Sequence, residues 1–179
     1  MDIIAHGLWA GLGVRSLARR TPVAARVAVL AVGASVLPDV LHLLPVALWA
    51  SFGGGGLEQL LAYALASPGS EPALPAWVAS WSHHLHCTGH SAIIAGGASL
   101  ALWHWRGRVW LPLAGWWLHI AIDVLTHSSD FYPVPVLYPI TYQGFDGIAW
   151  NTPWFMAANY ALLLLLWLVE GYRAFKSRP

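Results

Sequence analysis

The stretch W-S-H-H-L-H-C-T-G-H-S, from Trp81 to Ser91, places four histidines within eight positions of an otherwise apolar chain. Two further polar pairs interrupt apolar runs elsewhere, His119 with Asp123 and Asp39 with His42. We predict that helices bring these three groups together as one metal site, and that the rest of the chain holds them in place. The four histidines of the stretch are His83, His84, His86 and His90.

The composition is that of a membrane protein. Apolar residues make up 58% of the chain and charged residues 9%, whereas a soluble domain carries about 25% charged residues. Twelve tryptophans, many of them near the ends of apolar runs, are typical of an interfacial aromatic belt. The net charge of +1 indicates no nucleic-acid partner. The composition therefore predicts an all-α, polytopic integral membrane bundle.

The basic residues predict the topology. All nine lysines and arginines fall into three clusters, which the positive-inside rule places in the cytoplasm. The segments between the clusters must then cross the membrane an even number of times. The clusters are Arg15, Arg19, Arg20 and Arg26; Arg106 and Arg108; and Arg173, Lys176 and Arg178.

Apolar runs between these clusters predict about five transmembrane helices in a single domain over residues 1–179. A short interfacial helix is expected over Leu57–Ala66, and loops over Ser67–Pro75 and Ser128–Asn151. The expected spans are Asp2–Arg20, Val23–Ala50, Trp77–Trp105, Val109–Thr126 and Trp154–Tyr172.

The spacing of the polar residues within these helices favours a metal site. His86 and His90 are four residues apart, as are His119 and Asp123, so each pair shares a helical face. A lone aspartate in a span costs at least ~2.5 kcal/mol, and a bound cation would offset that cost. Imidazole with carboxylate favours zinc, although manganese and a centre of two or three ions stay open. The predicted ligands are His6, Asp39, His86, His90, His119 and Asp123.

Distance along the chain supports the same grouping. His90 lies sixteen residues before Arg106, and Asp123 lies fifteen residues after Arg108. At ~1.5 Å per residue both lie near 23 Å from the intervening turn, at the same height.

Less specific interpretations remain, because His83, His84 and His127 can be solvated bystanders and Asp39 can cap a helix that Pro38 breaks.

The loop Ser128–Asn151 is long for a connection, and loops of this length are often lids or binding segments. We expect it to pack over the site, with Asp130 or Asp146 reaching toward the metal. Its aromatic residues are Phe131, Tyr132, Tyr138, Tyr142, Phe145 and Trp150.

In order along the chain, these motifs resemble the bacterial membrane-bound metal-dependent hydrolases, also described as LexA-binding, inner-membrane-associated hydrolases. Two positions depart from that family's pattern: Leu41 stands where an acid is usual, and Cys87 where an arginine is usual. The matching elements are His6, Pro38-Asp39 with His42, His86 with His90-Ser91, His119 with Asp123 and Thr126, and Tyr138-Pro139.

The resemblance implies a multi-pass protein of the bacterial inner membrane and an activity similar to that of zinc-dependent phospholipase C. We expect hydrolysis of a lipid or lipid-linked ester, a phosphoester above all, at the outer face, with a free carboxylate or His84 as general base and His42 as a further catalytic-site residue that binds the metal or supports its ligands. A metal-ion transporter or channel would need polar residues continuing to the inner face, where only Ser35 and Ser99 interrupt apolar sequence. A non-catalytic, metal-stabilised scaffold is the third interpretation.

Overall fold

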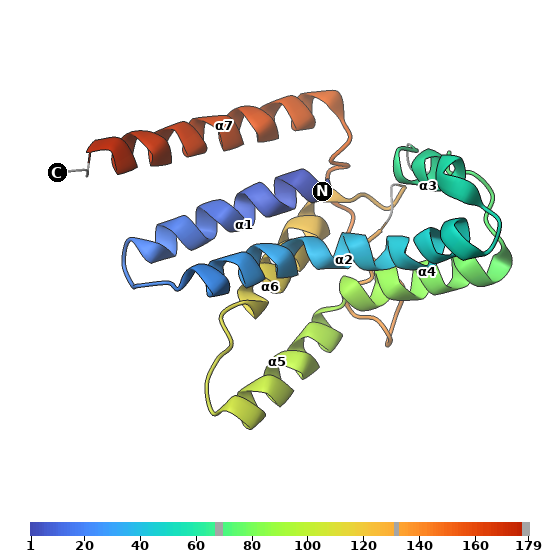
Figure 1. Cartoon of the computed structure of the whole chain (residues 1–179), viewed down its shortest axis with the longest axis horizontal. Coiled ribbons are helices and arrows are strands. Elements are labelled where there is room, and N and C mark those ends of the chain that lie inside the picture. Colours follow the sequence, from blue (N-terminus) through green and yellow to red (C-terminus); the bar gives the residue numbers. More distant parts are fainter. Residues whose placement is uncertain (67–69, 131–132, 177–179) are drawn as a thin grey trace.

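The computed structural model describes residues 1–66, 70–130 and 133–176. Within these ranges the chain forms seven α-helices and no strand, so the all-α prediction is confirmed there. Ser67, Phe131, Tyr132 and Arg178, which the predicted loops and basic clusters include, lie outside the described residues. The helices, drawn in Figure 1, are α1 Ile3–Ala18, α2 Ala25–Phe52, α3 Gly56–Ala64, α4 Ala76–Gly89, α5 Ala92–Arg106, α6 Leu113–Thr126 and α7 Pro153–Lys176.

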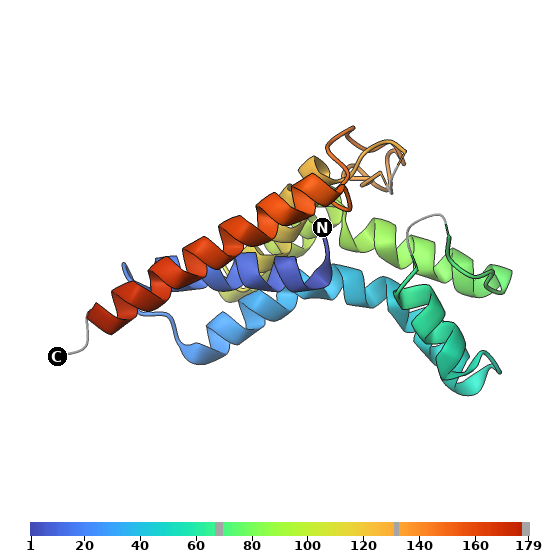
Figure 2. The ribbon, with the colours of Figure 1, turned by 90° about the horizontal axis from the view of Figure 1, so that it is seen from above.

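The other helices are arranged around α2, a helix of 28 residues with Pro38 and Pro45 in its interior. Helix α1 lies beside the first half of α2, α4 lies beside the second half, and α6 crosses near the middle (Figure 1). Helix α7 packs on α1. Figure 2 shows α3 leaving the far end of α2 on one side, with the loop before α7 on the other. The middle of α2 is therefore the point where three helices meet.

Two glycines allow this close approach. A Cβ atom on Gly115 of α6 would lie 1.8 Å from the carbonyl oxygen of Ala31 in α2. A Cβ atom on Gly89, the last residue of α4, would lie 3.0 Å from Cβ of Pro38. Side chains at either glycine would force the helices apart, so the sequence fixes the contacts of α2 with α6 and α4.

The predicted helix Trp77–Trp105 is wrong as a single element, because the chain breaks between α4 and α5. His90 caps the end of α4 with φ −101° and ψ 8°, and Ser91 caps the start of α5 by accepting a hydrogen bond of 3.1 Å from the backbone N–H of Ile94. Serine is a preferred N-cap because its hydroxyl satisfies a free helical N–H group. The predicted Leu57–Ala66 helix is confirmed as α3.

Among the described residues, two helices are long and apolar enough to cross a membrane, α2 and α7. This agrees with the predicted membrane association. Helices α1, α5 and α6 have 14 to 16 residues, which is about 21–24 Å of helix and shorter than a ~30 Å hydrocarbon core. Five crossings therefore stay a prediction.

Candidate metal centre

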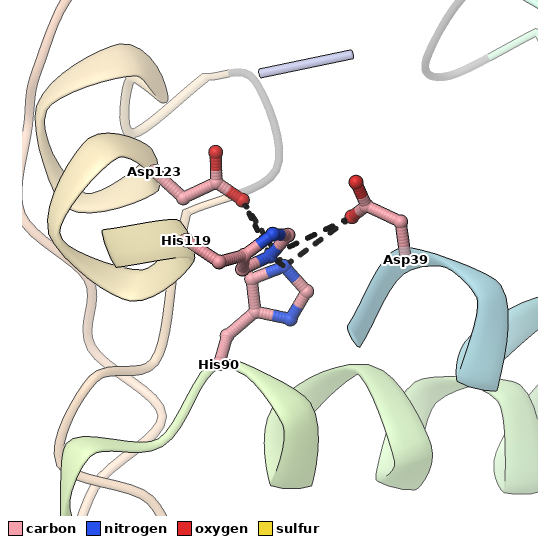
Figure 3. Close-up of side chains that lie close together, drawn as sticks. All are labelled: Asp39, His90, His119 and Asp123. Atoms are coloured by element: carbon pink, nitrogen blue, oxygen red, sulfur yellow. Dashed lines mark hydrogen bonds and ion pairs between the residues drawn. The ribbon is translucent and has the colours of Figure 1, made fainter. Parts of the chain in front are cut away.

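Four side chains from three parts of the chain meet at the middle of the molecule. Asp39 comes from α2, His90 from the α4–α5 junction, and His119 and Asp123 from successive turns of α6. Each offers one ligand atom, and these atoms all lie within 4.8 Å of one another. Figure 3 shows the two carboxylates converging on the two imidazole rings from opposite sides. The described residues thus contain a group that could hold a metal ion.

The spacing of the ligand atoms fits one small cation. The Nε2 atoms of His90 and His119 lie 3.0 Å apart, and each lies 3.2 Å from Oδ2 of Asp123. The same two nitrogens lie 3.6 and 3.8 Å from Oδ1 of Asp39. Four ligands placed tetrahedrally at 2.0–2.1 Å from zinc would be separated by roughly 3.3 Å. The observed separations are close to that value.

Backbone carbonyl groups orient both imidazoles. Nδ1 of His90 lies 2.8 Å from the carbonyl oxygen of His86, and Nδ1 of His119 lies 2.7 Å from that of Ser35. A carbonyl oxygen only accepts, so Nδ1 carries a proton in each ring, and Nε2 presents a lone pair when the ring is neutral. Histidine ligands of metals commonly have such a carbonyl partner. Two facing lone pairs 3.0 Å apart are more favourable with a cation between them.

Within the described residues, some buried polar atoms at the centre have no hydrogen-bond partner. They include Oδ2 of Asp39 and Nδ1 of His6. The side chains of His119 and Asp123 are fully buried, whereas that of Asp39 is 14% exposed. Unsatisfied polar groups in such an interior cost free energy, and a metal ion would satisfy them. The residues therefore fit a bound cation.

His6 lies next to this group. Its Nε2 atom is 2.9 Å from Oδ1 of Asp123 and 3.9 Å from Oδ2 of Asp39. Its ring stacks on that of His119 at a centroid distance of 3.9 Å, and the amino group of Met1 also contacts Oδ1 of Asp123. Asp123 thus presents one oxygen to His6 and the other to His119.

His86 was predicted as a ligand, but its ring lies next to that of His90 and outside the four-residue group. Its ring centroid is 4.1 Å from that of His90 and 5.8 Å from that of His42, but the four-residue group does not include it. Burial lowers the pKa of His86 well below its usual value, and the imidazoles of His90 and His42 act in the same direction. His86 and His42 therefore lie beside the four-residue group, and their roles stay predictions.

The two remaining histidines of the stretch reach the surface. His84 is exposed, and its Nδ1 lies 3.4 Å from the hydroxyl of Tyr138. The ring of His83 stacks on Tyr142 at 5.9 Å, and its Nε2 lies 3.6 Å from Sγ of Cys87. The polar stretch therefore runs from the buried centre at His90 to the surface.

The loop after α6 lies across the α4–α5 junction, as the lid prediction requires. The hydroxyl of Ser91 donates to the carbonyl oxygen of Tyr138 at 2.5 Å, and the N–H of Ala92 donates to that of Val136 at 2.8 Å. Asp146 is exposed and accepts from the N–H of Ser129 at 2.8 Å. Hydrogen bonds with the backbone and the side chain of Ser129 lower the pKa of Asp146. The Asp146 carboxylate does not reach the four-residue group.

Sequence reasoning missed the role of Ser35, whose carbonyl group orients His119. Its hydroxyl donates to the carbonyl oxygen of Val32 at 2.7 Å, and its side chain is buried. The available signal was a polar residue inside an apolar span, four residues before Asp39 and therefore on the same helical face.

Comparison of the chain with family models, with curated proteins and with solved structures finds no match.

Proposed function

We propose that this chain is a membrane-bound, metal-dependent hydrolase that acts on a lipid or lipid-linked ester, a phosphoester above all. One observation carries the proposal: ligand atoms of Asp39, His90, His119 and Asp123 converge at separations that suit a single divalent ion. Zinc is the favoured ion because the donors are imidazole nitrogen and carboxylate oxygen. A bound zinc ion lowers the pKa of its water to about 7 and so supplies a hydroxide nucleophile at neutral pH.

The partial exposure of Asp39 supports a catalytic rather than a structural ion. Catalytic zinc sites combine three protein ligands with an open position, whereas structural sites are closed by four protein ligands, so in a catalytic centre one of the four side chains would be an exchangeable ligand at the open position. His90, His119 and Asp123 are enclosed by protein, and Asp39 is the member with a side chain that is 14% exposed. A substrate would therefore approach from the Asp39 side of α2.

The surroundings of that opening suit a lipid. Leu37, Val40 and Leu44 are 50%, 46% and 49% exposed and form an apolar strip along α2, around the helix from Asp39. These side chains offer an apolar surface for acyl chains next to a polar centre. A lipid ester entering sideways would place its head group at Asp39 and its chains along α2.

Two histidines are candidates for the general base. His42 follows Asp39 by three residues, so it shares the face of α2 from which the opening is reached. His84 lies at the surface beside Tyr138. In this proposal His42 or His84 accepts a proton during the reaction, and the Tyr138 hydroxyl holds the His84 ring in place.

A second ion is part of the proposal, with His6 as its imidazole ligand. The two oxygens of Asp123 face different histidines, His6 through Oδ1 at 2.9 Å and His90 and His119 through Oδ2 at 3.2 Å. A carboxylate in this position can hold one ion on each oxygen. Loss of one ion, but not of both, in His6→Ala protein would support this arrangement.

We also propose five crossings, by α1, the first half of α2, α5, α6 and α7, in the bacterial inner membrane. The short helices α1, α5 and α6 would cross with help from arginines that extend to the head groups. With all basic clusters in the cytoplasm, the metal centre lies toward the outer face, and α4 lies outside the crossing segments.

The test combines elemental analysis with hydrolysis of phospholipid substrates by purified protein. Asp123→Asn and His119→Ala should lose the metal and the activity, while His104→Ala, at an exposed position of α5, should keep both. Full metal content in Asp123→Asn protein would overturn the proposed centre. Metal without hydrolysis would favour the scaffold, and metal flux into proteoliposomes would favour the transporter.

A further inference from the structure

A second polar site lies at the other end of α6 from the metal centre. A cavity of about 600 Å³ opens between the start of α2 and the connection from α5 to α6. Three arginines line it, Arg26, Arg106 and Arg108, together with apolar side chains. All three arginines are exposed, so their guanidinium groups can turn toward a ligand in the cavity.

These arginines carry uncompensated charge. Within the described part of the chain, the acidic partner Glu170 binds Arg19 and Arg173, and no ion pair involves the three cavity arginines. Arg106 lies over the ring of Trp110 at 5.9 Å, which leaves its N–H donors available. Three unpaired guanidinium groups around one cavity favour an anion, and arginine binds phosphate oxygens in pairs.

The start of α2 adds to this preference. The N-cap residue Ala24 lines the cavity and offers no side-chain hydrogen bond to the helix. The first N–H groups of α2 and the positive end of its dipole therefore face a cavity that already contains three arginines. The α2 terminus strengthens the anion site but is not needed to define it.

An apolar cavity continues from this site. It has a volume of about 500 Å³ and lies between α5 and α6. Val109, Trp110 and Leu111 line both cavities, so the two are adjacent. The remaining lining of the second cavity is almost entirely apolar: Ser99, Leu100, Trp103, Leu113, Ala114 and Trp117. An anion site joined to an apolar groove is complementary to an amphiphile rather than to a free anion.

We propose that these two cavities bind one anionic phospholipid. Its phosphate lies among Arg26, Arg106 and Arg108, and one acyl chain lies along Trp103 and Trp117 between α5 and α6. The site is separate from the metal centre and does not depend on the proposed hydrolase activity. It would tie the α5–α6 connection to the membrane surface through a bound lipid.

The test measures lipid binding to the purified full-length chain in detergent by native mass spectrometry, with phosphatidylglycerol and phosphatidylcholine as probes. Wild-type protein should bind phosphatidylglycerol more tightly. Each arginine near a lipid head group contributes about 1 kcal/mol, or about fivefold in affinity. Arg106→Gln/Arg108→Gln should therefore weaken phosphatidylglycerol binding roughly 25-fold. Arg15→Gln/Arg20→Gln, which removes the same two charges from exposed sites outside the cavity, should leave it unchanged.

Two further measurements distinguish binding of a lipid from binding of a free anion. Ala114→Trp fills the apolar cavity and should lower phosphatidylglycerol affinity, while Ala101→Trp, on an exposed position of α5 outside the lining, should not. Inorganic phosphate at millimolar concentration should fail to displace the lipid. Equal lipid binding by Arg106→Gln/Arg108→Gln and by the control Arg15→Gln/Arg20→Gln would overturn the proposal, as would full displacement by phosphate with no effect of Ala114→Trp.

Discussion

The carbonyl oxygen of Ser35 lies 2.7 Å from Nδ1 of His119 and fixes which nitrogen of that ring faces the centre. Ser35 lies one turn before Asp39 in α2, so a single turn of α2 orients one candidate ligand and supplies another. The distance between α2 and α6 therefore sets the geometry of the whole group. That distance depends on Gly115, which lies against Ala31 at the crossing.

Gly115→Ala should separate α2 from α6. The added Cβ atom would lie 1.8 Å from the carbonyl oxygen of Ala31 and 2.8 Å from its carbonyl carbon, so the backbone must move. Overpacking of this kind typically costs 1–3 kcal/mol, occasionally more. We expect a lower unfolding temperature in detergent and weaker metal binding, measured by thermal unfolding and elemental analysis.

Gly97→Ala is the matched control, because nothing lies within 4 Å of an added Cβ atom at this position of α5. Alanine is favoured over glycine in a helix by roughly 0.5–1 kcal/mol, so this variant should be as stable as wild type or slightly more stable. If both variants unfold at the wild-type temperature, the close crossing at Gly115 is not present.

The sequence was sufficient to predict that His119 and Asp123 share a helical face and that His90 lies at the same height, because helical rise and spacing are local properties. It was not sufficient to predict the break at His90. The i,i+4 spacing placed His86 and His90 on one continuous face, but α4 ends at its cap residue His90, α5 begins at its cap residue Ser91, and His90 lies against His119 of α6.

Whether His6 or His86 lies against Asp123 also depends on contacts between helices that are far apart in the sequence. It depends on how α1 and α4 pack on α2, and helix spacing within one segment contains no information about that packing. The apolar runs likewise located the helices.

The composition of the four-residue group predicts different effects for substitutions of His90 and His86. His90→Ala should abolish metal binding, because Nε2 of His90 contacts His119, Asp39 and Asp123. His86→Ala should keep the metal, because His86 supports the centre through its backbone carbonyl group. Elemental analysis of the two purified variants distinguishes them, and equal loss of metal from both would restore His86 as a ligand.

Asp146 should stabilise the loop in a pH-dependent way. Hydrogen bonding with Ser129 lowers the pKa of Asp146 in the folded protein, whereas in the unfolded chain it is near 3.9. The contribution is therefore fully present above about pH 4 and is lost as the pH falls through the lower folded-state value. The difference in unfolding temperature between wild type and Asp146→Asn should be constant from pH 7 to 5 and shrink toward pH 3.

Asp130→Asn removes the same charge from the same loop and serves as the control. Its difference from wild type should not follow the Asp146 profile. Hydrogen exchange at Gly147, Ile148 and Trp150, whose N–H groups pair with the carbonyls of residues 125–127, should be faster in Asp146→Asn protein at pH 7. Unchanged exchange there would contradict a role for Asp146 in closing the loop.

The proposed orientation predicts which segments a membrane-impermeant thiol reagent reaches. Cys87 is the single cysteine and is fully buried, so Cys87→Ser provides a background without thiols. In that background, Ser70→Cys, between α3 and α4, should react in intact spheroplasts because the segment between the first two basic clusters lies outside. Lys176→Cys, at the end of α7, should react only after the membrane is opened, because three basic clusters place that end in the cytoplasm. Reaction of Lys176→Cys in intact cells, with Ser70→Cys protected, would reverse the orientation and move the metal centre to the cytoplasmic side.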